Sequence, residues 1–162
     1  MNSSLHAVPF NTPLETGVRS LSILVASFPE IFDLQRLIEM DYLVVHSEDL
    51  GGPKSLHAAL PLRAGELLVR RGIIERGIML MMSRGLIRRI QNETGFSYQA
   101  TDSAAPFLAM LAAPYTRKLI VRSKWAISHF KNTPTDEIRE LTNQFFEKWS
   151  SEFQTIKTVE EN

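Results

Sequence analysis

Residues 60–102 constrain the fold more than any other stretch of the chain. Apolar residues recur there at helical spacing, at Leu67, Ile74, Ile78 and Met81, which predicts a long buried helix from about residue 61 to about residue 83. The glycine at position 85 can take the left-handed conformation that ends many helices. The next fifteen residues read as two short strands around a turn, so a β-hairpin is expected directly after the helix.

Two shorter helices are predicted before this stretch. The first begins at Thr12, a capping residue that precedes a proline, and it stops at Pro29. Asp33 can cap the second helix, and a glycine-containing loop follows at residues 48–60. Two helices, a long third helix and a hairpin predict a mainly α winged-helix domain at residues 12–112, with the small β-hairpin as its wing.

The chain after the hairpin is predicted to continue as helices. Pro114 marks a helix restart, and Thr133 with the proline behind it gives another start signal. We therefore expect a helical C-terminal extension at residues 113–154. A flexible N-terminus at residues 1–11 and a tail at residues 155–162 complete the predicted organisation.

The long helix carries a second apolar stripe, predicted to lie on the side opposite the first. A helix that is apolar on two sides is normally covered on both, so either a later helix of this chain or a partner protein must cover the second stripe. The last predicted helix has a bulky aromatic face that leaves the same two alternatives open. The predicted partner interface comprises Val69, Ile73, Arg76, Leu80, Phe145 and Trp149.

The net charge of zero hides an uneven distribution. Residues 61–90 hold seven arginines against two glutamates, whereas residues 1–60 and 132–162 each hold three basic against seven acidic residues. A basic middle can face phosphate or form the positive side of a protein interface. The neutral total and an outer stripe of apolar residues, which read base edges poorly, favour the protein role. The candidate phosphate contacts are Arg70, Arg71, Arg84, Arg88 and Arg89.

Composition excludes several classes of protein. The chain has no cysteine, so a disulfide framework, a thiolate metal site and a thiol nucleophile are all excluded. A hydrophobic content of 44% argues against wholesale disorder. No apolar run is long enough to span a membrane, and the first ten residues lack the pattern of a signal peptide. A cytoplasmic protein is expected.

A few residues have the chemistry of a catalytic or ligand site. His46, Ser47, Asp49 and His57 are residue types found in hydrolase triads and metal sites, but a catalytic role depends on geometry that their order does not supply. Residues 52–55 (GPKS) resemble the end of a phosphate-binding loop without its upstream glycine. We predict no catalytic, metal or cofactor residues, and a small hydrolase using His46 or His57 is the least favoured alternative.

Several motifs taken together resemble one known family. The chain is similar to the small middle component of bacterial three-component ABC-ATPase systems, such as the Lamassu type of anti-phage defence. The resemblance extends from about residue 12 to about residue 153. It rests on residues 41–47 (DYLVVHS), 51–53 (GGP), 55–57 (SLH), 60–63 (LPLR), 65–71 (GELLVRR) and 83–87 (SRGLI).

The resemblance implies a non-catalytic adaptor. In such systems the small subunit accompanies an ATPase similar to SMC and Rad50 proteins and a separate effector, often a nuclease, in a complex activated by foreign or unusual DNA. The expected partners are therefore an SMC-like ABC ATPase and an effector, with DNA as a possible third. The alternative that the basic middle leaves open is a dimeric winged-helix transcription regulator that binds DNA directly.

Overall fold

Helices make up most of the structure. The computed structural model describes residues 12–56 and 64–144, without the side chains of residues 64–69. Residues 135–144 are also helical. The elements run in the order α1 (Pro13–Ser27), β1 (Phe32–Asp33), α2 (Leu34–Val45), the short 3-10 helix η1 (Ser47–Leu50), α3 (Ala64–Ser83), β2 (Ile87–Asn92), β3 (Gly95–Ala100), α4 (Ala104–Met110) and α5 (Pro114–Phe130).

Local capping signals start the first two helices, as predicted. The side chain of Thr12 accepts a hydrogen bond from the backbone N–H of Glu15 at 3.3 Å, and a proline fills the first turn. The carboxylate of Asp33 accepts one from the N–H of Arg36 at 2.8 Å. The predicted stop of the long helix is also confirmed. Gly85 lies two residues after the end of α3 and has a φ of +70°, the left-handed conformation expected of a helix stop.

The sheet has three strands, not the two of the predicted hairpin. Strands β2 and β3 pair antiparallel from Ile87 opposite Ala100 to Asn92 opposite Gly95, which confirms the hairpin. Strand β1 pairs with the other edge of β3 and gives the order β1-β3-β2. Sequence patterning could not show β1, because a two-residue strand is too short to display alternation.

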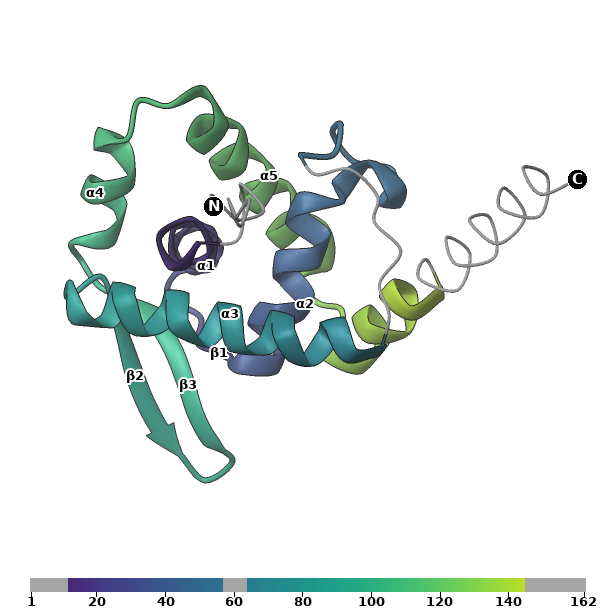
Figure 1. Ribbon diagram of the computed structural model, residues 1–162, viewed down its shortest axis with the longest axis horizontal. Helices are drawn as coiled ribbons and strands as arrows, with labels where there is room; N and C mark the ends of the chain where they lie inside the picture. The colour runs from purple at the N-terminus through teal and green to yellow at the C-terminus, as the bar shows by residue number, and fades with distance from the viewer. Residues whose placement is uncertain (1–11, 57–63, 145–162) are drawn as a thin grey trace, which may run out of the picture.

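Helix α1 is the central element of the fold. It contacts α2, α3, α4, α5 and β3, and Figure 1 shows it end-on with these helices around it. The hairpin of β2 and β3 projects away from this helical body. The predicted core stripe of α3 is confirmed at Ile74, Ile78 and Met81, which are fully buried, whereas the side chain of Leu67 lies outside the described residues.

Helix α5 belongs to the same hydrophobic core as the preceding helices. Leu119 and Ala126 are completely buried, and the helix packs against α1 and α2. The predicted continuation as helices after the hairpin is confirmed by α4, which covers seven residues, and by α5. Within residues 12–56 and 64–144, no helix is both long and apolar enough to cross a membrane.

Two glycines let α1 and α3 approach at backbone distance. A Cβ atom added at Gly77 would lie 2.6 Å from the backbone N of Gly17 and 2.7 Å from Oγ1 of Thr16. A Cβ atom at Gly17 would lie 2.8 Å from the carbonyl O of Gly77. Real Cβ atoms do not come so close to backbone, so these two positions fix how closely the helices can pack.

The Gly77→Ala variant is expected to be destabilised by about 1–3 kcal/mol, because the new methyl group forces α1 and α3 apart. Alanine ordinarily stabilises a helix interior by about 1 kcal/mol relative to glycine, so the predicted sign is the reverse of the usual one. Urea unfolding of the whole chain measures the difference.

Gly72→Ala is the matched control in the same helix. A Cβ atom there meets only Nη1 of Arg76, at 3.7 Å. This variant should be as stable as the parent or gain up to about 1 kcal/mol. Equal stabilisation by both alanines would show that the close approach at Gly77 is not a constraint.

Candidate interfaces

A buried carboxylate joins α1, α2 and α3. Asp41 has no solvent exposure, and its two oxygens accept hydrogen bonds from Nε of Arg19 at 2.8 Å and from Nη2 of Arg70 at 2.6 Å. The side chain of Arg19 is only 3% exposed. The guanidinium of Arg70 also lies over the ring of Tyr42, 5.6 Å from its centroid.

Burial and neighbouring charges shift the pKa values of Asp41 and Arg19. Burial alone would raise the pKa of Asp41, but the positive charges and hydrogen bonds of Arg19 and Arg70 together outweigh it and lower that pKa to about 2. Burial likewise opposes the charged form of Arg19, and the attraction of Asp41 more than compensates, so the pKa of Arg19 is raised. Asp41 and Arg19 are therefore both ionised at neutral pH.

The sequence placed Arg70 among candidate phosphate contacts, and the structure places it on Asp41 instead. A phosphate would have to compete with a carboxylate that is buried and doubly hydrogen-bonded. The signal that could have indicated this pairing is a pair of opposite charges on apolar helix faces, Arg19 in the first helix and Asp41 in the second. Such charges are almost never buried unless they are paired.

The outer face of α3 carries the second predicted stripe. Ile73 and Leu80 are half-buried, Leu80 packs against the core, and Arg76 is exposed. Consecutive helical positions differ by about 100°, so Arg76 and Leu80 each lie about 160° around the helix from Ile78, while Ile73 lies about 100° from Ile74. The stripe therefore lies on the side of α3 away from its core residues, with Ile73 nearest to them. Its role as a partner contact remains a prediction. The side chain of Val69 and the whole of residues 145 and 149 (Phe145, Trp149) lie outside the described residues.

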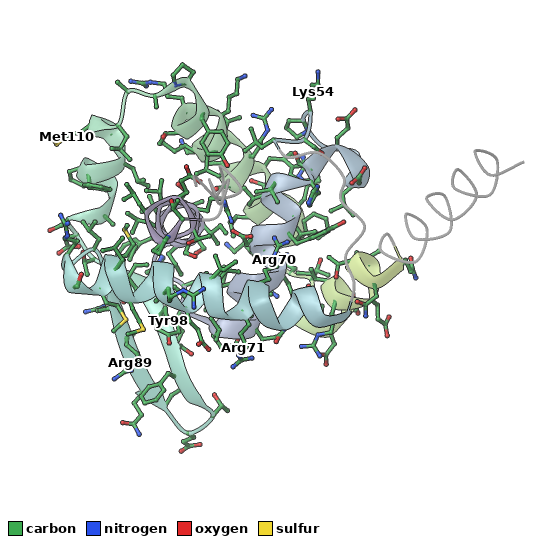
Figure 2. The ribbon with its side chains drawn as sticks, viewed as in Figure 1. Lys54, Arg70, Arg71, Arg89, Tyr98 and Met110 are labelled. Carbon is green, nitrogen blue, oxygen red and sulfur yellow. The ribbon has the colours of Figure 1, made fainter. Side chains whose placement is uncertain are left out.

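The arginines of the hairpin are held by neighbours on β3. Arg88 donates through Nε to Oε1 of Gln99 at 2.8 Å, and its Nη2 contacts the same oxygen. The guanidinium of Arg89 lies over the ring of Phe96, 4.2 Å from the centroid. Figure 2 shows Arg89 on the projecting hairpin. These contacts fix the orientation of both guanidinium groups but leave Arg89 and Phe96 at the surface.

The remaining two predicted arginines lie in the first half of α3 and directly after its end. Arg71 forms an exposed ion pair with Glu75 one helical turn later, at 3.3 Å. Arg84 follows the end of the helix and is exposed. Exposed pairs of this kind contribute little to stability and exchange readily with other partners, so Arg71 stays available for an external anion.

An apolar patch that the sequence analysis did not single out lies beside a cleft. Phe28 is 52% exposed and Ile31 is 41% exposed. Both border a cleft of about 550 Å³ between the end of α1 and the segment after α5, and Phe28 also borders a second hollow of about 210 Å³. We call Phe28, Ile31 and this cleft the Phe28 groove. Large exposed apolar side chains beside a concave surface are typical of protein contact sites.

Arg36 fixes the far wall of the Phe28 groove. Its Nη1 donates to the carbonyl of Thr133 at 2.8 Å, and its Nη2 donates to the carbonyl of Phe130 at 3.0 Å. The guanidinium also stacks over Phe32, 5.2 Å from the ring centroid. Burial lowers the pKa of Arg36, although the charge of Asp33 works against that shift. One side chain thus ties the start of α2 to the end of α5.

Two of the residues with hydrolase chemistry, His46 and Ser47, can be placed from described contacts. Ser47 donates from Oγ to the carbonyl of Pro53 at 2.8 Å, and His46 is buried against Tyr42 with ring centroids 4.7 Å apart. His57 lies outside the described residues. Among the side chains of the described ranges, no group of three His, Asp or Glu residues could hold a metal ion.

Substituting Asp41→Asn should destabilise the fold by about 3–5 kcal/mol, because Arg19 is left buried without its counter-charge. The effect should depend on pH. The folded pKa lies near 2 and the ordinary value is 3.8, so the carboxylate stabilises the fold above the ordinary value, and this stability is lost as the pH falls through 2. Urea unfolding of both proteins at several pH values should show the difference narrowing from about pH 5 downwards.

Glu93→Gln removes an exposed carboxylate at the hairpin turn and is the control for this series. It should leave the free energy of unfolding unchanged at every pH. A stability difference between the parent and Asp41→Asn that stays constant down to low pH would contradict the ion-pair account.

The chain matches one family across most of its length. The family described as ABC-three component (ABC-3C) system Middle Component 2 matches residues 9–152. No curated protein and no solved structure matches the chain. The matched residues include every described helix and strand. The protein therefore belongs to the ABC-three component (ABC-3C) system Middle Component 2 family.

Proposed function

We propose that this protein is a non-catalytic adaptor that binds the ABC ATPase of its system and a second component. Family membership implies partner subunits. The observation that carries the adaptor role is the Phe28 groove, where two large apolar side chains stand exposed beside a 550 Å³ cleft. Aromatic side chains in such hollows supply most of the binding energy of protein interfaces.

The arrangement of the elements supports a winged helix as the framework of the adaptor. The order α1, β1, α2, α3, β2, β3 and the strand order β1-β3-β2 fit that fold, with α3 before the wing. In a DNA reader the outer face of α3 would carry polar groups for base edges. Here that face exposes Met79 and half-exposes Ile73 and Leu80, which suits a protein partner better.

An adaptor needs two separate contact surfaces. The outer face of α3 and the Phe28 groove are formed by different elements, so two partners can be bound at once. We assign the groove to the ATPase, and the α3 face with Ile73, Arg76 and Leu80 to the second component. The family resemblance supports an SMC-like ATPase, an effector such as a nuclease, and a role in anti-phage defence activated by DNA.

Removing the apolar side chains of the groove should release the ATPase. The double variant Phe28→Ser, Ile31→Ser is expected to weaken that interaction by at least about 30-fold, since loss of a buried aromatic anchor costs about 2 kcal/mol or more. The tagged chain is expressed with its genomic neighbours, and the mass of what stays bound through a sizing column is determined.

Met110→Ser is the matched control, because Met110 is 81% exposed on α4 and does not line the groove. It should retain the ATPase. Retention of the ATPase by the groove variant would remove the groove from the interface, and a parent chain that binds none of its neighbours would refute the adaptor role itself.

A dimeric winged-helix regulator is the second candidate, favoured by the exposed Arg76, Arg84 and Arg89 on α3 and the wing. This function predicts a lone dimer on the sizing column and tight binding to the chain's own promoter. The triple variant Arg76→Gln, Arg84→Gln, Arg89→Gln should then lose promoter binding, while an unrelated duplex binds about a thousandfold more weakly than the promoter. Equal affinity for both duplexes rules this function out.

A further inference from the structure

Helix α5 presents an exclusively basic set of charges. From Pro114 to Lys131 the sequence contains five lysines and arginines and no aspartate or glutamate. Arg117, Lys118 and Lys124 are exposed, while the opposite face of the helix is anchored in the core through Leu119 and Ala126. The basic side chains therefore stand on a rigid support.

The glycine loop before α3 adds a fourth cation to this face. Nε of Arg122 donates to the carbonyl of Lys54 at 2.9 Å. Gly52 lies against the indole of Trp125 so closely that no Cβ atom fits there. These contacts hold the exposed Lys54 beside α5, at the edge of the molecule seen in Figure 2. We call Lys54, Arg117, Lys118 and Lys124 the α5 basic surface.

The four cations have no carboxylate partner among the described side chains, where every ion pair within 4.0 Å involves other residues. On the α3 side, by contrast, Arg70 and Arg71 are both paired with carboxylates. The four positive charges of the α5 basic surface are therefore available to an external anion.

We propose that the α5 basic surface binds the phosphate backbone of double-stranded DNA. Arg117 and Lys124 are seven residues apart on one helical face, a span of about 10 Å. Duplex DNA displays about six negative charges over that length. Contacts to the phosphate backbone carry no base-sequence information. Lysine and arginine side chains can therefore make them without reading the bases.

An acidic protein fits this surface less well. The centres of protein interfaces are depleted in charge and enriched in aromatic residues. Val121 is the one exposed apolar side chain that lies among the cations of α5. The Phe28 groove has the opposite character, with an aromatic and an aliphatic side chain at its edge. The two surfaces therefore differ in the kind of partner they suit.

The proposal places DNA on a different side of the molecule from the wing. Figure 2 shows Lys54 and Arg89 at opposite ends of the view, with the helical body between them. The proposal of DNA binding does not depend on the adaptor role, because DNA at α5 leaves the Phe28 groove and the outer face of α3 free for proteins.

The test is the affinity of the full chain for a short labelled DNA duplex, measured by fluorescence anisotropy between about 50 and 200 mM salt. The variant Arg117→Gln, Lys118→Gln, Lys124→Gln should bind at least about tenfold more weakly. The slope of log K against log salt should fall by about 0.9 for each phosphate that the variant no longer neutralises. Its thermal unfolding and its recovery of the ATPase should match the parent.

Arg76→Gln, Arg84→Gln, Arg89→Gln removes three exposed cations from the α3 and wing side and serves as the control of equal charge. It should change the DNA affinity less than about twofold. The proposal is overturned if this control loses DNA binding while the α5 variant keeps it, or if the parent does not bind the duplex at the lowest salt. Release of a protein subunit by the α5 variant, without any DNA binding by the parent, would identify an acidic protein as the ligand and also overturn it.

Discussion

The carboxylate of Asp41 is the group on which the rest of the structure depends. It is completely buried and accepts hydrogen bonds from arginines on two other helices, so it sets the relative positions of α1, α2 and α3. A buried ion pair adds little net stability compared with an apolar core, but it tolerates few alternative packings because a displaced charge would stay buried without a partner. Together with the close glycine packing between α1 and α3, it restricts how the three helices can pack against one another.

Sequence reasoning succeeded where the determining chemistry is local. Thr12, Asp33 and Gly85 mark helix ends because each acts on backbone groups within a few residues of itself. It failed where the cause is tertiary. Strand β1 exists because β3 offers it a free edge, and no pattern of two residues can reveal that. The role of Gly77 depends on the backbone of α1, which lies sixty residues earlier in the chain.

The candidate surfaces show the same division. The sequence shows a basic middle, but a count of its charges does not show which of them form ion pairs in the folded protein. Asp41 forms an ion pair with Arg70, whereas no cation of α5 lies within 4.0 Å of a carboxylate among the described side chains. The sequence marks Phe28 only as the residue before Pro29, where the first predicted helix stops, because the exposure of Phe28 is decided by the elements that pack around it. The sequence shows which residues could form a contact surface, and the fold decides which of them are exposed and unpaired.

The same constraint bears on how the proposed adaptor could transmit a signal. Coupling between two binding sites in proteins amounts to about 1–3 kcal/mol. Separating the charges around Asp41 would cost about 3–5 kcal/mol, which is more than such coupling supplies. If a partner binds the outer face of α3, we therefore expect α1, α2 and α3 to move as one body. Because Arg36 connects α2 to the end of α5 and to the wall of the Phe28 groove, displacement of that body carries the groove with it.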